Sequence, residues 1–323
     1  MATSLHRKGL ISVSDKIIME ARKAMEFVKL FTTDFSIKDE AKQYSTVNVK
    51  TCIGAVNKFE KGVHNYVKGN GKVDFADIVL SENDISNFTF DDLDVLEDEF
   101  APDWTKLGPA AGRKLGYEFI KAMVGLLTYD TAETTKTLAA SIAASTYADF
   151  VSLRSKTIAA GYDPADCVVL LQPTAYDHLI ALMDYKTTGD SSIADGAIIG
   201  AKLGFRSIMN SPNCSKVSGA AVSGVSPQLG VGFVVPSDAL GFANRQKKAI
   251  KGAQGNIIEA GYTQDEETGL IVSTRVVLNS DDGECTWNAE TLYGVARMKQ
   301  SHTINGVSVA NGAPGFVQLL VEG

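Results

Sequence analysis

The sequence has few of the residues on which enzymatic and metal-binding chemistry most often depends. It contains four cysteines and four histidines in 323 residues. The cysteines are far apart and form no CxxC pair, so neither a zinc knuckle nor a disulfide framework is indicated. We expect them to be reduced and mostly buried as small side chains: Cys52, Cys167, Cys214 and Cys285.

Catalytic motifs are also missing. There is no GxSxG, HExxH or P-loop sequence and no paired-histidine metal spacing. A hydrolase would need a nucleophile and a base from the four cysteines and the four histidines, and none of these lies in a recognisable motif. The histidines are His6, His64, His178 and His302. His178 lies on the helix predicted after Pro173, where a structural or surface histidine is a simpler interpretation than a catalytic base. The sequence therefore predicts no catalytic residue, no cofactor-binding residue and no metal ligand.

A basic excess and a long hydrophobic run are absent as well. The chain has 31 basic and 38 acidic residues, and this net charge of -7 argues against a protein that binds phosphate backbones. No stretch is long enough for a signal peptide or a membrane span, so we expect synthesis in the cytoplasm. The acidic run within residues 88–100 lacks the glycine and ligand spacing of an EF-hand and predicts a solvated face.

Two long helices are predicted in the first half of the chain. Ser12 and Asp15 have the spacing of a capping box, and residues 14–31 are predicted to be an amphipathic helix. Its apolar face consists of Ile17, Ile18, Ala21, Met25 and Val28. We take a neighbouring subunit as the candidate partner of this face, so deletion of residues 1–31 should abolish assembly and spare folding. Pro109 is expected to open a second helix, in which Gly112 and Gly116 indicate close packing. Its inward residues are Leu115, Phe119, Met123 and Leu126, and it ends near Leu127.

Two shorter helices are predicted, one before and one after a buried strand in the sequence. Thr146 and Asp149 form a capping box for a helix that ends at Gly161, with Tyr147, Phe150 and Val151 predicted to face inward. The run 167–171 is an apolar strand. Pro173 then opens a helix, whose inward face is Tyr176, Leu179, Ile180 and Met183.

Hairpin and strand patterns occupy much of the remaining chain. Residues 46–53 and 73–80 are predicted strands of a long hairpin, with the turn signal Asn70-Gly71 at its polar tip. Residues 211–230 are rich in Ser, Gly and Ala and predict a mobile exposed loop. A buried strand is predicted at 232–240. Residues 270–278 alternate in polarity and pair in antiparallel with 285–296, and a last strand is expected at 316–321.

Three segments, in this order, resemble the HK97-like major capsid proteins of tailed phages. The first is 164–179, a strand followed by Pro-x-x-Tyr and a helix. The second is 196–211, a glycine-spaced segment that ends in a strand and a serine and lacks the GxGxxG fingerprint of dinucleotide sites. The third is Gly-Phe-Val-Val-Pro-Ser-Asp-Ala-Leu-Gly-Phe-Ala at 232–243, followed by the strand pair within 268–296.

The resemblance implies an α+β chain with an HK97-like capsid fold. Its domains would be an N-terminal arm, an extended E-loop hairpin, a peripheral domain with a spine helix near residues 110–127, an axial domain, return strands of the peripheral domain and a C-terminal extension. In this sequence they correspond to residues 1–43, 44–85, 86–162, 163–255, 256–300 and 301–323.

The resemblance also implies a function without catalysis. The chain would self-assemble as hexamers and pentamers into an icosahedral shell that encloses double-stranded DNA in a virion, with portal, scaffold or decoration proteins as further partners. In some family members a lysine of the E-loop forms an isopeptide with an asparagine of a neighbour. The candidates here are Lys58, Lys61, Lys68 and Lys72 with Asn279 or Asn288. Two alternatives stay open, namely an encapsulin-type compartment around cargo enzymes and a soluble α/β enzyme.

Overall fold

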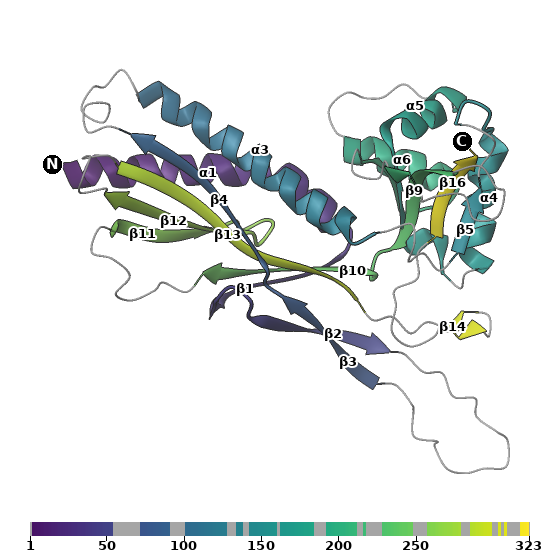
Figure 1. Cartoon of the computed structure of the whole chain (residues 1–323), viewed down its shortest axis with the longest axis horizontal. Coiled ribbons are helices and arrows are strands. Elements are labelled where there is room, and N and C mark those ends of the chain that lie inside the picture. Colours follow the sequence, from purple (N-terminus) through teal and green to yellow (C-terminus); the bar gives the residue numbers. More distant parts are fainter. Residues whose placement is uncertain are drawn as a thin grey trace, which may run out of the picture. The chain divides into compact units, whose positions relative to one another are not determined.

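The chain forms two compact units, each assembled from three separate segments. Unit 1 is Met1–Val47, Ile78–Met123 and Gly241–Ala296, and unit 2 is Asn48–Asp77, Val124–Leu240 and Arg297–Gly323. The computed structural model describes the following residues: 2–53, 72–90, 101–127, 134–137, 142–159, 162–183, 192–211, 216–217, 228–247, 257–278, 285–298, 303–304, 307–308 and 317–322. The mixture of helices and sheets confirms the predicted α+β class (Figure 1).

Unit 1 is built on a six-stranded sheet. The strands follow the order β1-β10-β13-β12-β11, and β4 also pairs with β13. Their bounds are β1 Thr32–Ala41, β4 Glu82–Phe90, β10 Leu240–Lys247, β11 Ile257–Gln264, β12 Ile271–Leu278 and β13 Cys285–Arg297. The predicted antiparallel pairing of the two late strands is confirmed, because β12 and β13 pair from Ser273 opposite Glu290 to Leu278 opposite Cys285. Strands β1, β4 and β11 carry no hydrophobic pattern from which they were predicted.

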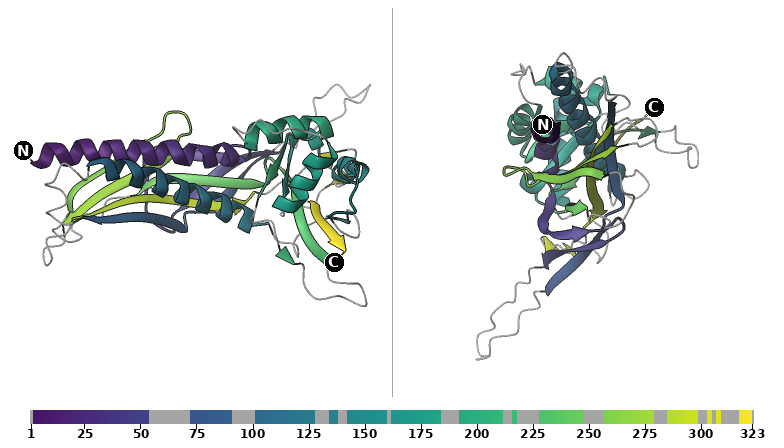
Figure 2. Two further views of the ribbon diagram at one scale, coloured as in Figure 1. Left: turned by 90° about the horizontal axis from the view of Figure 1, so that it is seen from above. Right: turned by 90° about the vertical axis from the view of Figure 1, so that its left-hand side faces the viewer.

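Two long helices lie along one face of this sheet (Figure 2). They are α1, Ala2–Val28, and α3, Ala101–Gly125. The predicted close packing at the α3 glycines is confirmed. A Cβ at Gly112 would lie 2.3 Å from the carbonyl oxygen of Ile17, and one at Gly116 would lie 2.7 Å from Cβ of Ala24. Because contacts this short leave no room for a side chain, glycine sets the distance between the two helices.

Both helices begin earlier than the sequence signals predicted. Ser12 and Asp15 lie inside α1 and cannot be its N-cap, and Pro109 lies inside α3 rather than at its start. A proline within a helix removes one backbone hydrogen bond. The rest of α3 offsets this cost by burying Leu115, Phe119 and Met123, as predicted. Leu126, expected within the helix, follows its last residue and is only partly buried.

The apolar face of α1 is buried in its own unit. Ile17, Ala21, Met25 and Val28 are fully buried and Ile18 nearly so. Their neighbours include α3 and β12. A neighbouring subunit is therefore not the partner of this face, and the earlier expectation that residues 1–31 can be deleted without unfolding is wrong. Loss of these side chains removes part of the core of unit 1.

Strands β2, Thr46–Ile53, and β3, Lys72–Val79, form a separate two-stranded sheet. This confirms the predicted hairpin strands to within one residue. The base of the hairpin is closed by hydrogen bonds between Leu80 and the chain at Tyr44 and Ser45. The predicted tip with Asn70-Gly71 and the predicted acidic face at 91–100 lie outside the described residues.

Unit 2 contains a second six-stranded sheet, in the order β5-β16-β9-β6-β7, with β8 also paired to β9. The bounds are β5 Thr134–Thr137, β6 Cys167–Leu171, β7 Ser207–Asn210, β8 Lys216–Val217, β9 Gln228–Pro236 and β16 Val317–Glu322. Two short strands, β14 Thr303–Ile304 and β15 Val307–Ser308, pair with each other. The predicted strands at 167–171 and 316–321 are confirmed. Of residues 211–230, predicted to be a mobile exposed loop, 216–217 form β8 and 228–230 begin β9, whereas 212–215 and 218–227 lie outside the described residues.

The strand predicted at 232–240 is in fact two strands. β9 ends at Pro236, a turn follows in which the amide of Ala239 donates to the carbonyl of Pro236, and β10 begins at Leu240. Pro236 has no amide proton for a further ladder bond. The turn also marks a boundary between units, since unit 2 ends at Leu240 and unit 1 resumes at Gly241.

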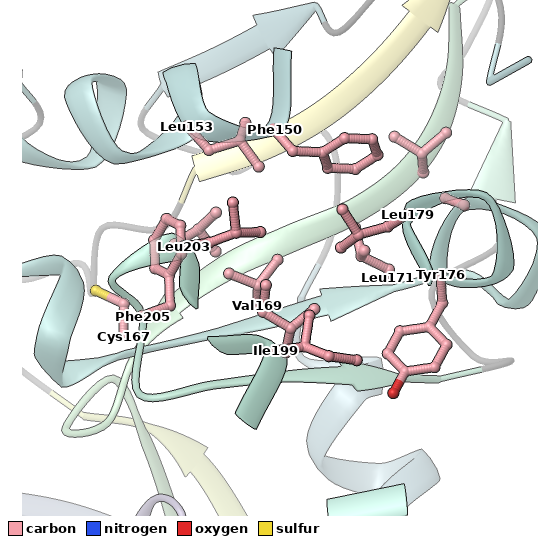
Figure 3. Packing of buried hydrophobic residues seen from close by; sticks show 14 of the residues in the cluster. Phe150, Leu153, Cys167, Val169, Leu171, Tyr176, Leu179, Ile199, Leu203 and Phe205 are labelled. Atoms are coloured by element: carbon pink, nitrogen blue, oxygen red, sulfur yellow. The ribbon is translucent and has the colours of Figure 1, made fainter. Parts of the chain in front are cut away.

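Three helices complete the core of unit 2: α4 Tyr147–Ala159, α5 Pro173–Leu182 and α6 Ser192–Leu203. Their apolar side chains pack with one face of β6 (Figure 3). The short helix η3, Pro164–Asp166, precedes β6. In α6, a Cβ at Gly196 would lie 2.3 Å from the carbonyl oxygen of Ile208 and one at Gly200 would lie 2.7 Å from Cα of Ser207. Glycines four residues apart thus let α6 lie directly on β7.

The capping box of α4 is confirmed, but its inward face is partly wrong. The amide and hydroxyl of Thr146 donate to the Asp149 carboxylate at 2.8 and 2.7 Å. Phe150 is buried as predicted, whereas Tyr147 and Val151 are exposed. The helix period instead buries Leu153 and Thr157 with Phe150. The stop predicted at Gly161 lies outside the described residues. In α5, Tyr176 and Leu179 are buried as predicted, with Ile180 and Met183 packed against the same core.

The compact units do not follow the boundaries of the domains implied by the resemblance. Unit 1 takes β10 from residues 163–255, and unit 2 takes β16 from 301–323. The domain names themselves stay predictions. Within the described ranges, none of the helices has the length and apolar character needed to cross a membrane.

Candidate functional site

The residues considered as nucleophile or base are not brought together in the described structure. Cys167 is a fully buried residue of β6, where burial raises the pKa of its thiol far above the ordinary value. Nε2 of His178 lies 2.9 Å from the carbonyl oxygen of Ser145 and so ties α5 to the segment before α4. Cys167 is inert as a nucleophile at neutral pH, and His178 is placed as a structural residue.

The other cysteines and histidines are not described at the level of side chains. Residues 64, 214 and 302 lie outside the described ranges. His6 lies in α1, Cys52 in β2 and Cys285 at the start of β13. The predicted isopeptide lysines Lys58, Lys61 and Lys68 and the predicted Asn279 lie outside the described ranges, whereas Lys72 begins β3 and Asn288 lies in β13. Among the described side chains, no group of three metal-ligating residues is close enough to hold a metal ion.

An ionic cluster fastens α1 to the turn between β11 and β12. Nε of Arg22 donates to both carboxylate oxygens of Asp265, at 3.1 and 3.0 Å, and its Nη2 donates to Oδ1 at 2.5 Å. The Thr268 amide donates to the same carboxylate at 3.1 Å, and so does the Thr268 hydroxyl. Burial by itself raises the pKa of Asp265, but the hydrogen bonds from Arg22 and Thr268 outweigh it and leave the pKa below its ordinary value.

A second polar contact joins β4 and β13. The Tyr293 hydroxyl donates to the Asp84 carboxylate at 2.7 Å. Desolvation by burial raises the pKa of Asp84 despite this hydrogen bond. Burial, followed by the hydrogen bond to Asp84 and then by the Asp84 charge, raises the pKa of Tyr293. The ring of Tyr293 also packs edge-on against Phe119 of α3, with ring centres 4.8 Å apart. Tyr293 therefore anchors β13 to both a strand and a helix.

Charged side chains also link neighbouring strands. Arg245 of β10 donates to the Asp34 carbonyl and carboxylate of β1 at 2.9 and 3.0 Å. Glu290 of β13 contacts Lys247, and lies 3.5 Å from Nε of Arg275. Each of these groups has an opposite charge as its partner. These contacts connect neighbouring strands of the unit 1 sheet.

Asn244 fills the place where strands β10 and β12 both approach β13. Its amide nitrogen donates to the carbonyls of Leu292 and Ile271, at 3.0 and 3.4 Å, and its oxygen accepts from the Ile271 amide at 2.8 Å. The side chain is fully buried. Asn244 thus provides hydrogen-bond partners for backbone groups of β12 and β13 at a point where strand pairing does not provide them.

Exposed apolar side chains form the remaining candidate surface. On α4, Tyr147, Val151 and Ile158 are each about two-fifths exposed and lie together on one side of the helix, next to its buried face. In unit 1, Tyr262 of β11 and Ile85 of β4 are each 51% exposed. Exposed apolar groups scattered singly are normal on a protein surface, so the three neighbouring side chains of α4 form the clearest candidate for a contact with another protein surface. These exposed side chains are the candidate assembly surfaces.

Comparison with known proteins gives matches only among solved structures. No protein-family model and no curated protein matches the chain. It is similar to a chain from the capsid of the cyanophage P-SCSP1u, at 13% identity and a TM-score of 0.47, covering 91% of this chain and 87% of that one. It is also similar to a chain from the capsid of Ralstonia phage GP4, at 10% identity and a TM-score of 0.47 with the same coverage. A third match is to the capsid of Myoviridae phage XM1, at 8% identity, a TM-score of 0.44 and coverage of 91% and 90%.

Proposed function

We propose that the chain is the major capsid protein of a tailed double-stranded DNA phage, a shell subunit that assembles as hexamers and pentamers. The observation that carries the proposal is the hairpin of β2 and β3, whose strands pair only with each other among the described residues. An isolated two-stranded hairpin is at best marginally stable in water. A hairpin of eight-residue strands outside both main sheets is therefore suited to lie on another copy of the chain.

The order of elements supports the same function. A long α1, the hairpin, the long α3, the α/β unit 2 and the β12–β13 pair follow one another as the sequence resemblance implies. A thin shell repeated many times needs extended elements that bury surface on neighbours. Many moderate contacts of this kind add up to a stable lattice.

The proposed protein has no catalytic activity and needs no cofactor. The buried charges of unit 1 are held in pairs that connect helices and strands, and Cys167 of unit 2 is buried as an apolar side chain. Its main partner is a further copy of itself. Portal, scaffold and decoration proteins are further proposed partners, and the proposed location is the virion, around DNA that it does not bind in a sequence-specific manner.

Electron microscopy and sedimentation of the purified chain at several salt concentrations test this function. We expect closed shells, tubes or ring-shaped capsomers. A uniform small species under every condition, including coexpression with the genes that flank its own, contradicts the proposal. Protein cargo in place of DNA inside native shells would instead identify an encapsulin-type compartment.

A further inference from the structure

Strand β11 leaves one edge of the unit 1 sheet unpaired. It pairs with β12 over residues 257–264, and no other described strand pairs with it. Ala260, Gly261 and Tyr262 in its middle are exposed to solvent. Its backbone amides and carbonyls on the outer side therefore have no ladder partner within the described chain, which is the arrangement that accepts an added strand.

The other two long edges of the same sheet carry charges that oppose such pairing, and β11 does not. Natural edge strands are protected by charged residues, proline or bulges. β1 contains four charged residues, Asp34, Lys38, Asp39 and Glu40, and a register shift against β10. β4 contains Glu82 and Asp84. β11 has neither proline nor lysine, its one charged residue is Glu259, and its register shift lies at its first residues.

We propose that β11 pairs in antiparallel with β11 of a second copy, about a two-fold axis at Gly261. This inference rests on the proposed function, because it assumes that copies of the chain assemble. The contact is isologous, so Gly261 faces Gly261, and any other residue faces the residue equally far from 261 on the opposite side in the second copy. It joins two six-stranded sheets into one and satisfies the outer backbone groups of both β11 strands.

The sequence of β11 is self-complementary in this register. Tyr262 lies opposite Ala260 of the second copy, and residues 260 and 262 share a face of the strand, so each ring meets a small residue. Glu259 lies opposite Thr263, which keeps the two carboxylates apart. Gly261 faces Gly261 and allows close approach. Pairing with β1 would instead bring Glu259 towards a strand with three acidic residues, and like charges across strands are destabilising.

Cross-linking of particles carrying Gly261→Cys tests the register. The substitution fits the fold, since a Cβ at Gly261 would meet only Oγ1 of Thr274, at 3.7 Å. Facing Cα atoms in an antiparallel pair are about 4.5–5.5 Å apart, within the reach of a disulfide. We expect oxidised particles to yield disulfide-linked dimers on a non-reducing gel, and wild-type particles treated in the same way to yield monomers.

Thr263→Cys is the matched control. In the proposed register, residue 263 of one copy lies four positions along the strand from residue 263 of the other, about 13 Å away. No disulfide can span this distance, so this variant should run as monomers on the non-reducing gel. Equal cross-linking at 261 and 263, or a cross-link from 261 to any other segment, overturns the proposed pairing. Absence of a cross-link in normally assembled Gly261→Cys particles also overturns it while leaving the proposed function intact. If the wild-type chain forms no particles at all, it is the proposed function that fails.

Charge swapping provides an independent test. Gly261→Lys and Gly261→Glu each place like charges directly across the axis, and we expect each alone to reduce the particle yield about fivefold or more. An equal mixture restores Lys opposite Glu and should recover assembly. Thr33→Lys at the β1 edge is the control and should assemble as wild type. Normal assembly of both single variants, or no recovery in a mixture of chains with native circular dichroism, overturns the proposal.

Discussion

Unit 1 and unit 2 hold their helices and strands together by different chemistry. In unit 1, buried or half-buried polar groups connect the elements, as in the pairs Arg22–Asp265, Arg245–Asp34 and Tyr293–Asp84. In unit 2, the core between β6 and the helices α4, α5 and α6 is apolar, and its cysteine behaves as a small hydrophobic residue. Stability in unit 1 should therefore respond to pH and to single charges. Stability of the unit 2 core should respond mainly to lost volume.

Removal of one aromatic ring from each unit should have the largest effect. Phe119→Ala in unit 1 and Phe150→Ala in unit 2 each empty a fully buried site and should cost about 3–5 kcal/mol of unfolding free energy. Hydrogen exchange should show the loss of protection confined mainly to the unit that carries the substitution. Equal loss in both units after either change would mean that they unfold together.

The same small substitution at two positions of α3 tests the helix contact in unit 1. Gly112→Ala places a Cβ against the Ile17 carbonyl and should cost about 1–3 kcal/mol or more, because backbone must move. Gly125→Ala has nothing within 4 Å of its new Cβ and should change stability by less than about 1 kcal/mol. Urea denaturation of both variants makes the comparison. A neutral Gly112→Ala would show that α1 and α3 are free to separate.

Loss of a single charge should be felt in unit 1. Asp265→Asn weakens the hydrogen bonds from Arg22 and Thr268 and should cost about 1–3 kcal/mol. Glu267→Gln, which alters a pair between Arg22 and a side chain that is 70% exposed, should cost less than about 1 kcal/mol. Chemical denaturation at neutral pH measures both. Equal effects would contradict the assignment of the stabilisation to the buried carboxylate.

The pH dependence of unit 1 should be the smallest of these effects and should have two opposite contributions. The pKa of Asp265 is lowered by folding, so its contribution is present above the unfolded-state pKa of about 4 and is lost as pH falls further. The pKa of Asp84 is raised by folding, so its contribution is present at low pH and is lost as pH rises through the folded pKa. Denaturation midpoints of the wild type between pH 3 and 7, compared with those of Asp265→Asn and Asp84→Asn, separate the two. In Asp265→Asn the loss of stability below about pH 4 should become shallower.

Local signals in the sequence predicted most of the elements whose ends are set locally. The Thr146 capping box, the Pro173 start and the polarity alternation of 270–278 were all found. The starts predicted at Ser12 and Pro109 were wrong, because both residues lie inside helices that begin at Ala2 and Ala101. Strand β1 was missed because its polar sequence is held by parallel pairing with β10, more than 200 residues away.

The candidate assembly surface was less predictable than the fold. Tyr147 and Val151 have the composition of a core, and only the period of α4 combined with the position of Phe150 shows that they face outward. The free edge of β11 is a property of strand order. No window of the sequence contains that information, because the order depends on which distant strands pair.

The last described strand has a consequence for how the chain folds during synthesis. β16, Val317–Glu322, lies between β5 and β9, so the sheet of unit 2 lacks an interior strand until residues 317–322 have been synthesised. Unit 1 likewise needs β13, which ends at Arg297. Contacts so distant in sequence close slowly, and partly made chains expose apolar surface. A chain that stops before residue 317 would therefore leave the unit 2 sheet without the strand that joins β5 to β9.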